Sequence, residues 1–249
     1  MTNPSKPLQG QVALITGSVR RIGRATALEL SRLGAAIVVN ARSSLEEAQA
    51  VKLEIENAGG QALVCMGDIR DEATVEAMMA QVIARFGRLD ILVNNASIRA
   101  DSDFLSLSLA EWRDVTSIIL DGTFLCSRAA LVHMLKTGAG RIVNIGGVSA
   151  KIGAAHRAHV VTAKAGIEGF TRALAHEFSP RGVTVNCVVP GKIGGKRSAT
   201  SGKGIEAKVI TPREGEAQDV ARMVAYLCLP ETGFVTGQSF NVNGGMYMS

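Results

Sequence analysis

A cluster of ionisable side chains precedes Lys164 in the stretch AHRAHVVTAKA, which spans residues 155–165. His156 and His159 have ordinary pKa values near neutrality, which is the range that a general acid or base needs. Arg157 could stabilise a developing oxyanion, but its guanidinium would not release a proton. The stretch therefore predicts a candidate site for acid–base chemistry close to Lys164.

A second chemical motif lies near the N-terminus, where VALITGSVRRIG (12–23) places glycines between an expected strand and an expected helix. Gly17 permits a tight turn, and Gly23 lets the helix and the strand pack closely. The helix N-terminus then offers backbone N–H groups and a positive dipole end to a pyrophosphate. A strand, a glycine loop and a helix in this order predict a dinucleotide-binding βαβ unit.

The residues after the second expected strand indicate which nicotinamide cofactor is bound. An NAD site usually has Asp or Glu there, on the ribose 2′-hydroxyl, whereas this chain reads VVNARSS, with Asn40 followed by Arg42 and Ser43. Arg20 of the glycine loop can approach the same place, and guanidinium groups bind phosphate in a bidentate way. We therefore expect NADP(H) rather than NAD(H). The alternative is that Arg20, Arg21 and Arg42 are solvated surface charges.

Short apolar runs alternate with longer helical patterns along the whole chain. The expected strands cover residues 12–16, 35–39, 62–66, 90–95, 141–145, 183–189 and 240–242. The expected helices cover residues 22–33, 45–58, 72–86, 109–136, 157–178 and 216–229. Continuous apolarity suits strands that are buried on both faces. The alternation predicts an α/β fold with a doubly wound, parallel, seven-stranded sheet, helices on both faces and right-handed crossovers.

The domain organisation is simple, because no linker, repeat or low-complexity segment interrupts the alternation. We expect a single domain over 1–249, with a short polar tail at 1–9. The one irregular stretch is GKIGGKRSATSGKGIEAK (191–208), which is rich in glycine and lysine. The loop at 192–208 predicts either a lid over the substrate or an irregular surface excursion.

Composition limits the classes of function. The 249 residues are 47% apolar and 20% charged, with a net charge of +5. The basic residues are scattered, which argues against a nucleic-acid partner. The four cysteines, Cys65, Cys126, Cys187 and Cys228, are far apart in apolar stretches and predict buried thiols, and we expect no metal site. We see neither a signal peptide nor an apolar run long enough to span a membrane, and expect a cytoplasmic protein.

Several short motifs follow one another in a specific order: TGxxxRxG, Asp68 after the third strand, NNA at 94–96, Lys164, PG at 190–191 and TGQSFNVNGG at 236–245. This set resembles the short-chain dehydrogenase/reductase family over nearly the whole chain. Most of the chain resembles the 3-oxoacyl carrier-protein reductases. Arg21 stands in place of the usual middle glycine of the loop, and this variant of the loop resembles that of the pteridine-reductase-like branch. The resemblance implies a Rossmann fold whose cofactor contacts come from Gly17, Ser18, Arg20, Arg21, Ile22, Gly23, Arg42, Ser43, Asp68, Ile69, Asn94, Ala96, Lys164, Pro190, Gly191 and Ile193.

The same resemblance implies how the reaction would run and where this chain departs from it. In the family the nicotinamide supplies a hydride, a tyrosine supplies the proton, a serine holds the carbonyl and an asparagine maintains a water relay. Lys164 matches the family lysine and would hold the nicotinamide ribose. Val160 occupies the tyrosine position, Gly147 the serine position and Ile119 the asparagine position. None of these three side chains can donate a hydrogen bond or a proton.

Two hypotheses follow from these replacements. In the first, which we favour, the chain is an NADP(H)-dependent oxidoreductase that interconverts a small-molecule carbonyl and an alcohol, with His159 or His156 as proton donor and Ser149 as carbonyl donor. One residue along a regular helix turns a side chain by about 100°. That turn would direct His159 away from the Val160 direction, whereas His156 lies nearer to it but could belong to the preceding loop. In the second hypothesis, the chain is an inactive NADP(H)-binding scaffold or sensor.

The family resemblance also implies an assembly. In the family, the long helices expected at 109–136 and 157–178 pair between subunits. Both helices read apolar on more than one face, which fits burial against a partner. We expect a homotetramer, with a dimer as the alternative, and neither a nucleic acid nor a membrane as partner.

Overall fold

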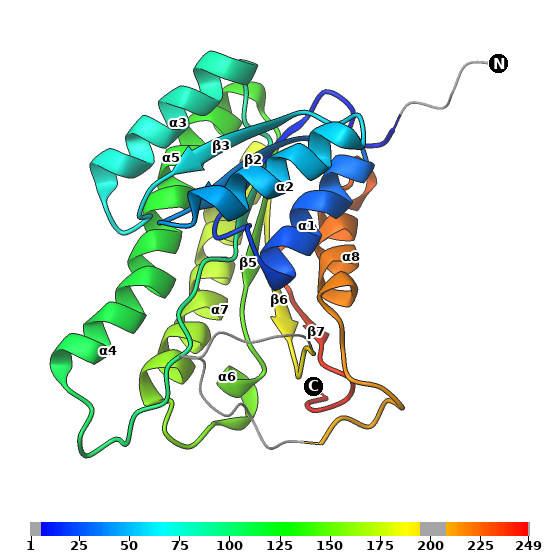
Figure 1. Ribbon diagram of the computed structural model, residues 1–249. Coiled ribbons are helices and arrows are strands. Elements are labelled where there is room, and N and C mark those ends of the chain that lie inside the picture. Colours follow the sequence, from blue (N-terminus) through cyan, green and yellow to red (C-terminus); the bar gives the residue numbers. More distant parts are fainter. Residues whose placement is uncertain (1–5, 195–207, 249) are drawn as a thin grey trace.

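One seven-stranded parallel sheet organises residues 6–194 and 208–248, which are the residues that the computed structural model describes. The strand order is β3-β2-β1-β4-β5-β6-β7 (Figure 1). The strands are Val12–Ile15 (β1), Ala36–Ala41 (β2), Ala62–Met66 (β3), Ile91–Asn94 (β4), Gly140–Ile145 (β5), Val183–Pro190 (β6) and Ser239–Val242 (β7). The α-helices are Arg21–Arg32 (α1), Leu45–Asn57 (α2), Glu72–Phe86 (α3), Leu109–Thr116 (α4), Gly122–Thr137 (α5), Ser149–Ile152 (α6), Ala158–Phe178 (α7) and Ala217–Cys228 (α8).

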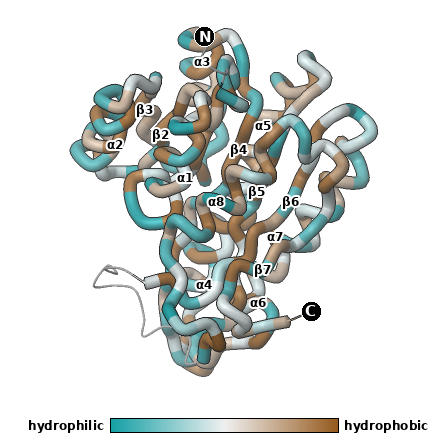
Figure 2. The backbone as a smooth tube through the Cα atoms, turned by 90° about the vertical axis from the view of Figure 1, so that its right-hand side faces the viewer, coloured by the Kyte–Doolittle hydropathy of each residue, from teal (hydrophilic) through white to brown (hydrophobic). Residues whose placement is uncertain are grey.

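Helices cover both faces of the sheet, and this explains why the strands are apolar throughout. In β1, Val12 and Leu14 join the core that includes α3, α4, α5 and α7, whereas Ala13 and Ile15 join the core that includes α1, α2 and α8 (Figure 1). Successive side chains of a strand point to opposite faces, so a strand covered on both sides must be apolar at every position. Figure 2 shows hydrophobic backbone along the central strands. The predicted fold class is confirmed.

Most boundaries agree with the expected ones to within one residue, and three differences are larger. Strand β2 continues to Ala41, two residues beyond the expected end, because it pairs with β3 as far as Ala41 and Met66. The helix expected at 109–136 consists of α4, a π-helical segment at Ser117–Asp121 and α5. The short helix α6 (Ser149–Ile152) was not expected, because four residues are too few to show a helical period.

The expected polar tail at 1–9 and the expected lid loop at 192–208 each lie only partly within the described residues. Leu8, in the expected tail, is fully buried, and its N–H donates to the carbonyl oxygen of Leu33 at 2.9 Å. The expected lid loop at 192–208 falls mostly on residues 195–207, which lie outside the described residues. All four cysteines are buried free thiols, as predicted.

One helical stretch of the described chain, Leu109–Thr137, is long and apolar enough to cross a membrane by length and composition. The expectation that no run reaches this length is therefore wrong for this stretch. However, 56% of its most apolar 18-residue window is buried inside the fold. Packing inside the fold therefore accounts for part of its hydrophobicity, and core helices of globular domains pass the same test.

Candidate functional site

The glycine loop between β1 and α1 forms the floor of a large cavity at the carboxyl ends of the strands. Gly17 has a φ of +61°, and a Cβ added to it would lie 3.1 Å from the Cα of Ala96. A Cβ on Gly23 would lie 2.4 Å from the carbonyl oxygen of Gly17, so no larger residue fits there. Both glycines are therefore required by close backbone approach, and the loop has the geometry predicted for a phosphate-binding turn.

The cavity itself has a volume of about 810 Å³, within the usual range of small-molecule sites. Eleven of the sixteen predicted cofactor residues line it: Gly17, Arg20, Arg21, Ile22, Arg42, Ser43, Asp68, Ile69, Ala96, Lys164 and Pro190. A twelfth, Gly191, lines a smaller cavity beside it. The structure thus brings together residues from six separate segments of the sequence at one edge of the sheet, where open α/β folds bind their ligands.

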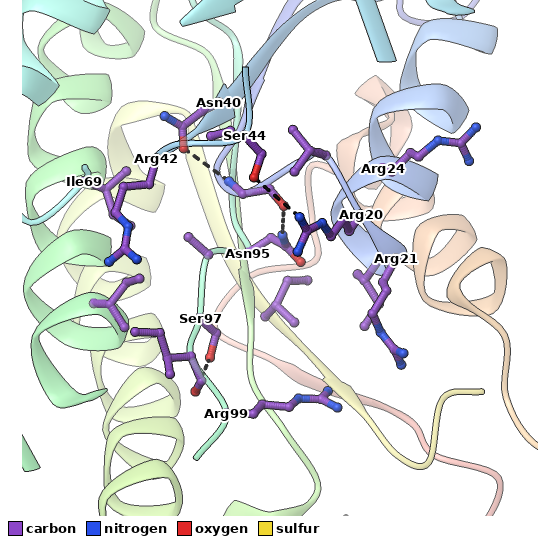
Figure 3. Close-up of a pocket in the computed structure, with 18 of the residues that line it drawn as sticks. Arg20, Arg21, Arg24, Asn40, Arg42, Ser44, Ile69, Asn95, Ser97 and Arg99 are labelled. Atoms are coloured by element: carbon purple, nitrogen blue, oxygen red, sulfur yellow. Dashed lines mark hydrogen bonds between the residues drawn. The ribbon is translucent and has the colours of Figure 1, made fainter. Parts of the chain in front are cut away.

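Basic side chains surround the part of the cavity beside β2. Figure 3 shows Arg20, Arg21 and Arg24 on the α1 side, Arg42 on the opposite side and Arg99 at the lower end. Arg20 already has a partner, because its Nε lies 2.8 and 2.7 Å from the two carboxylate oxygens of Glu47. This concentration of positive charge is suited to a ligand that carries several phosphate charges.

Asn40, where an NAD site would have an acid, is committed to the fold. It is only 2% exposed. Its Oδ1 accepts from the N–H of Gly17 at 3.2 Å, and its Nδ2 donates to the carbonyl oxygens of Cys65 (3.1 Å) and Gly67 (3.3 Å). Asn40 therefore ties the glycine loop to β3 through side-chain hydrogen bonds.

Arg21 connects the glycine loop to the segment after β6. It has a φ of +48°, a conformation that side chains other than glycine rarely adopt. Its Nη2 donates to the carbonyl oxygens of Ile193 at 2.9 Å and Gly194 at 3.3 Å. The sequence predicted a cofactor contact for Arg21, and the structure adds this bridge between two loops that border the cavity.

Asp68 also lines the cavity, beside Ile69, but its carboxylate is engaged within the protein. Arg70 donates to both of its oxygens, with Nη2 at 2.6 Å from Oδ2. This hydrogen bonding by Arg70 is the main cause that lowers the pKa of Asp68, and Arg42 adds a smaller electrostatic contribution. Asp68 is therefore a charged hydrogen-bond acceptor at neutral pH.

The two asparagines of the NNA motif face different places. Asn94 is buried, and its Nδ2 donates to Oδ1 of Asn144 at 2.8 Å, which joins β4 to β5. Asn95 lines the cavity, and its Nδ2 donates to the carbonyl oxygens of Thr16 and Gly17, both at 2.9 Å. The prediction selected Asn94, whereas the residue at the cavity is Asn95.

Four predicted cofactor residues line neither cavity: Ser18, Gly23, Asn94 and Ile193. They support the site from behind. The Oγ of Ser18 accepts from the N–H of Asn40 at 3.1 Å, and the side chain of Ile193 packs in the core while its carbonyl oxygen receives Arg21. Conversely, Arg99 lines the cavity and was not predicted as a contact, because it belongs to none of the motifs in the sequence.

Lys164, on α7, lies where the large cavity meets the smaller one and lines both. It is 8% exposed, and its Nζ donates to the carbonyl oxygen of Ile145 at 2.6 Å. The pKa of the Lys164 ammonium is lowered to about 8, mainly by burial; Cys187 acts in the opposite direction, and the positive charge of Arg99 adds a smaller lowering effect. The Lys164 ammonium can therefore lose its proton at a pH that is only slightly above neutral.

The smaller cavity has a volume of about 60 Å³, and two of the three positions that the sequence predicted to be replaced line it. Val160 and Gly147 both line it, and Ser149 lines it as well. A Cβ added to Gly147 would lie 3.7 Å from Oγ of Ser149. Ile119, by contrast, is 1% exposed, lies in the π-helical segment and lines neither cavity.

The two histidines do not reach either cavity in the described part of the chain, which argues against the proton donors predicted from the sequence. His159 is fully buried on another face of α7 from Val160, and neither of its ring nitrogens has a hydrogen-bond partner among the described residues. His156 lies before α7 at a φ of +60°, with an exposed ring whose Nδ1 is 3.8 Å from Oδ2 of Asp103. The helix turn and the loop conformation both direct the imidazoles away.

The comparisons with known proteins agree with this architecture. Residues 17–247 match the family model described as enoyl-(acyl carrier protein) reductase. A 3-oxoacyl-[acyl-carrier-protein] reductase of Synechocystis sp. is 40% identical over 243 residues, which cover 97% of this chain and 98% of that protein. The corresponding Escherichia coli reductase is 39% identical over 244 residues, which cover 96% and 98%.

Solved structures are similar as well. A dehydrogenase/reductase from Sinorhizobium meliloti superposes with a TM-score of 0.91 at 35% identity and covers 98% of each chain. A gluconate 5-dehydrogenase from Burkholderia cenocepacia, solved with NADP and tartrate, superposes with a TM-score of 0.87 at 28% identity and covers 97% of each chain. The chain belongs to the short-chain dehydrogenase/reductase family. Within that family it is similar to the 3-oxoacyl carrier-protein reductases.

Proposed function

We propose that this chain is an NADP(H)-dependent oxidoreductase that interconverts a carbonyl compound and an alcohol. The observation that carries the proposal is the continuity of one cavity, which extends from the basic side chains around the end of β2 to Lys164 on α7. A dinucleotide needs this arrangement, with phosphate groups at one end and the reacting ring at the other. Relatives of this chain are named as reductases, and a similar structure was solved with NADP.

The residues of the cavity fit a phosphorylated dinucleotide. Gly17 lines the cavity in the turn before the N-terminus of α1, where backbone N–H groups and the helix dipole would receive a pyrophosphate. Arg42 and Ser43 would bind a 2′-phosphate, with Arg20 once it exchanges Glu47 for the ligand. Lys164 would hold the nicotinamide ribose. When bound, the cofactor supplies or accepts a hydride.

The carbonyl oxygen of the substrate needs hydrogen-bond donors in place of the missing family serine. Ser149 is 6% exposed and lines the smaller cavity, and its Oγ is close to where a side chain on Gly147 would begin. We assign the orientation of the carbonyl to Ser149. The histidines are not assigned as donors, because neither ring lines the cavities.

Activity is tested in two stages with the purified chain. Calorimetric titration with NADPH and NADH measures binding, and NADPH consumption is then followed with a panel of carbonyl compounds. Because the relatives are named 3-oxoacyl carrier-protein reductases, 3-oxoacyl thioesters begin the panel, followed by oxo acids. We expect NADPH binding and turnover, with His159→Ala and His156→Ala retaining the activity. Absence of binding to either cofactor would refute the proposal.

A second function, that of an inactive NADP(H)-binding scaffold or sensor, has one specific observation in its favour. Val160 and Gly147 both line the smaller cavity, where they offer no side-chain donor. Tight binding of NADPH with no consumption on any compound of the panel would favour this second function over the first. The likeness of the Arg21 loop to pteridine reductases stays a prediction, and adding oxidised pterins to the panel tests it.

Exposed apolar side chains on the outer surface of α4 and α5 support association between subunits. Leu109, Phe124 and Val132 are 60%, 45% and 55% exposed there, and apolar residues gathered on one helix pair mark a contact surface. We propose a homotetramer, with a dimer as the alternative, in the cytoplasm. Light scattering on the purified protein measures the mass of the assembly, and a monomer at micromolar concentration would refute it.

A further inference from the structure

We propose that Lys164 itself gives the proton to the carbonyl oxygen during reduction, and takes it back during oxidation, through the smaller cavity. This role differs from holding the ribose, and it rests on the proposed oxidoreductase function. Lys164 becomes a catalytic residue in place of the tyrosine that Val160 has replaced.

The first argument is the place of Lys164 between the two cavities. Among the described residues, six line both of them: Ser97, Arg99, Gly146, Gly147, Lys164 and Pro190. Only Arg99 and Lys164 of these carry a side chain that ionises as a base. A guanidinium keeps its proton at any pH at which proteins function. Lys164 is therefore the one group of this described set whose side chain can change its ionisation near neutral pH.

The second argument is the space that Val160 leaves. Val160 lies one helical turn before Lys164 on α7, so both side chains are on the same face of the helix. Val160 is 6% exposed and lines the smaller cavity without filling it. A volume of about 60 Å³ is enough for a water molecule. A proton can therefore travel from Nζ to a substrate oxygen, directly or over one water.

The third argument is the surroundings of the ammonium. Its Nζ is bonded to a main-chain carbonyl oxygen, that of Ile145, at 2.6 Å. The nearest carboxylate on its own helix, Glu168, is already bound by Lys151 of α6 and by Ser239 of β7. Lys164 therefore forms no ion pair with Glu168, and such an ion pair would otherwise keep the Lys164 amine protonated.

Charged and titratable groups reach Lys164 from the neighbouring elements. Arg99, after β4, disfavours the ammonium, and the Cys187 thiol of β6 favours it. Arg157, before α7, and Lys192, after β6, border the smaller cavity and are paired with Asp101 and Glu214. Burial, together with the opposing effects of Cys187 and Arg99, leaves Lys164 with a pKa of about 8, so both protonation states are accessible near neutral pH.

The step balances as follows in the direction of reduction. A reduced nicotinamide, when bound, would supply a hydride with its two electrons to the carbonyl carbon. One N–H bond of the Lys164 ammonium breaks, and its proton bonds to the carbonyl oxygen, so that an alcohol forms. Lys164 is left as a neutral amine, which solvent water protonates again before the next turnover.

The test compares Lys164→Arg and Lys164→Ala with the unchanged chain, and Lys136→Arg, at the end of α5, serves as the matched control. Binding of NADPH is measured by calorimetry, and the rate of carbonyl reduction is measured against pH. For the unchanged chain we expect the rate to fall as pH rises through about 8. Lys164→Arg should bind NADPH within a few-fold but reduce at least ~100-fold more slowly, without the decline near pH 8.

Lys164→Ala adds an outcome that a purely structural role would not produce. Added ethylammonium should restore part of its reduction rate, because a free amine can occupy the vacated space and supply the proton. Retention of rate and pH profile in Lys164→Arg, or no rescue of Lys164→Ala despite normal NADPH binding, would overturn the assignment. The proposed function would survive those results, and it fails separately if the unchanged chain neither binds NADPH nor consumes it.

Discussion

Replacing Arg42 with alanine should weaken the binding of NADPH far more than that of NADH. Arg42 is exposed beside the cavity, with Asp68 as an electrostatic neighbour, whereas Arg20 is already paired with Glu47. Arg42 is therefore the guanidinium most readily given to a 2′-phosphate. A hydrogen bond to a charged group contributes about 1.5–3 kcal/mol, and solvent exposure favours the lower part of this range. At about 1.4 kcal/mol per factor of ten, the Kd for NADPH should rise roughly 10- to 100-fold.

Calorimetric titration of both cofactors, at low and at moderate salt, measures this difference. Arg85→Ala, on α3, is the matched control, because Arg85 stacks on Phe86 and does not line the cavity. NADH should bind Arg42→Ala about as well as it binds the unchanged chain, since NADH lacks the 2′-phosphate. An equal loss for the two cofactors, or no loss for NADPH, would refute the assignment of Arg42. In that case Arg20 would be the next candidate, tested by the same titration.

Three further predictions concern stability and the smaller cavity. Gly147→Ser should leave the melting temperature nearly unchanged, because an added Cβ makes only ordinary contacts at 3.7 Å or more. It should also speed reduction about tenfold, because the new hydroxyl adds an oxyanion donor. Melting curves check the first effect, and steady-state rates check the second. Arg21→Gly should lower the free energy of unfolding by about 1–2 kcal/mol, because the lost hydrogen bonds to Ile193 and Gly194 outweigh the relief of its positive φ. Urea unfolding measures this change, and a more stable variant would contradict the prediction. Burial lowers the pKa of His159 below its ordinary 6.5, so the unfolded chain takes up the proton first and stability falls as pH drops below about 6.5. His159→Leu should reduce that fall, measured by urea unfolding at about pH 7.5 and about pH 5.5, and an unaltered pH dependence would contradict the reasoning.

The residues themselves predicted the site best where its geometry is local in sequence, and the family motifs supplied distant residues such as Asp68 and Lys164. The glycine loop is one turn between neighbouring elements, so Gly17 was assigned to a phosphate-binding turn from its place between a strand and a helix, and it lines the cavity. The NNA motif was less informative, because adjacent residues at a strand end point in opposite directions. The end of β4 directs Asn94 to β5 and leaves Asn95 at the cavity.

By itself, the sequence determined the layered α/β architecture and the phosphate-binding end of the cavity. Both depend on patterns that repeat over a few residues: continuous apolar strands, alternating helices and a glycine-rich turn. Only the tertiary structure decided which ionisable group reaches the reacting end. His159 and Lys164 are five residues apart on α7, yet one is buried away from the cavities and the other joins them. The face of a helix that meets a cavity is set by packing against distant strands, which the local order of residues does not specify.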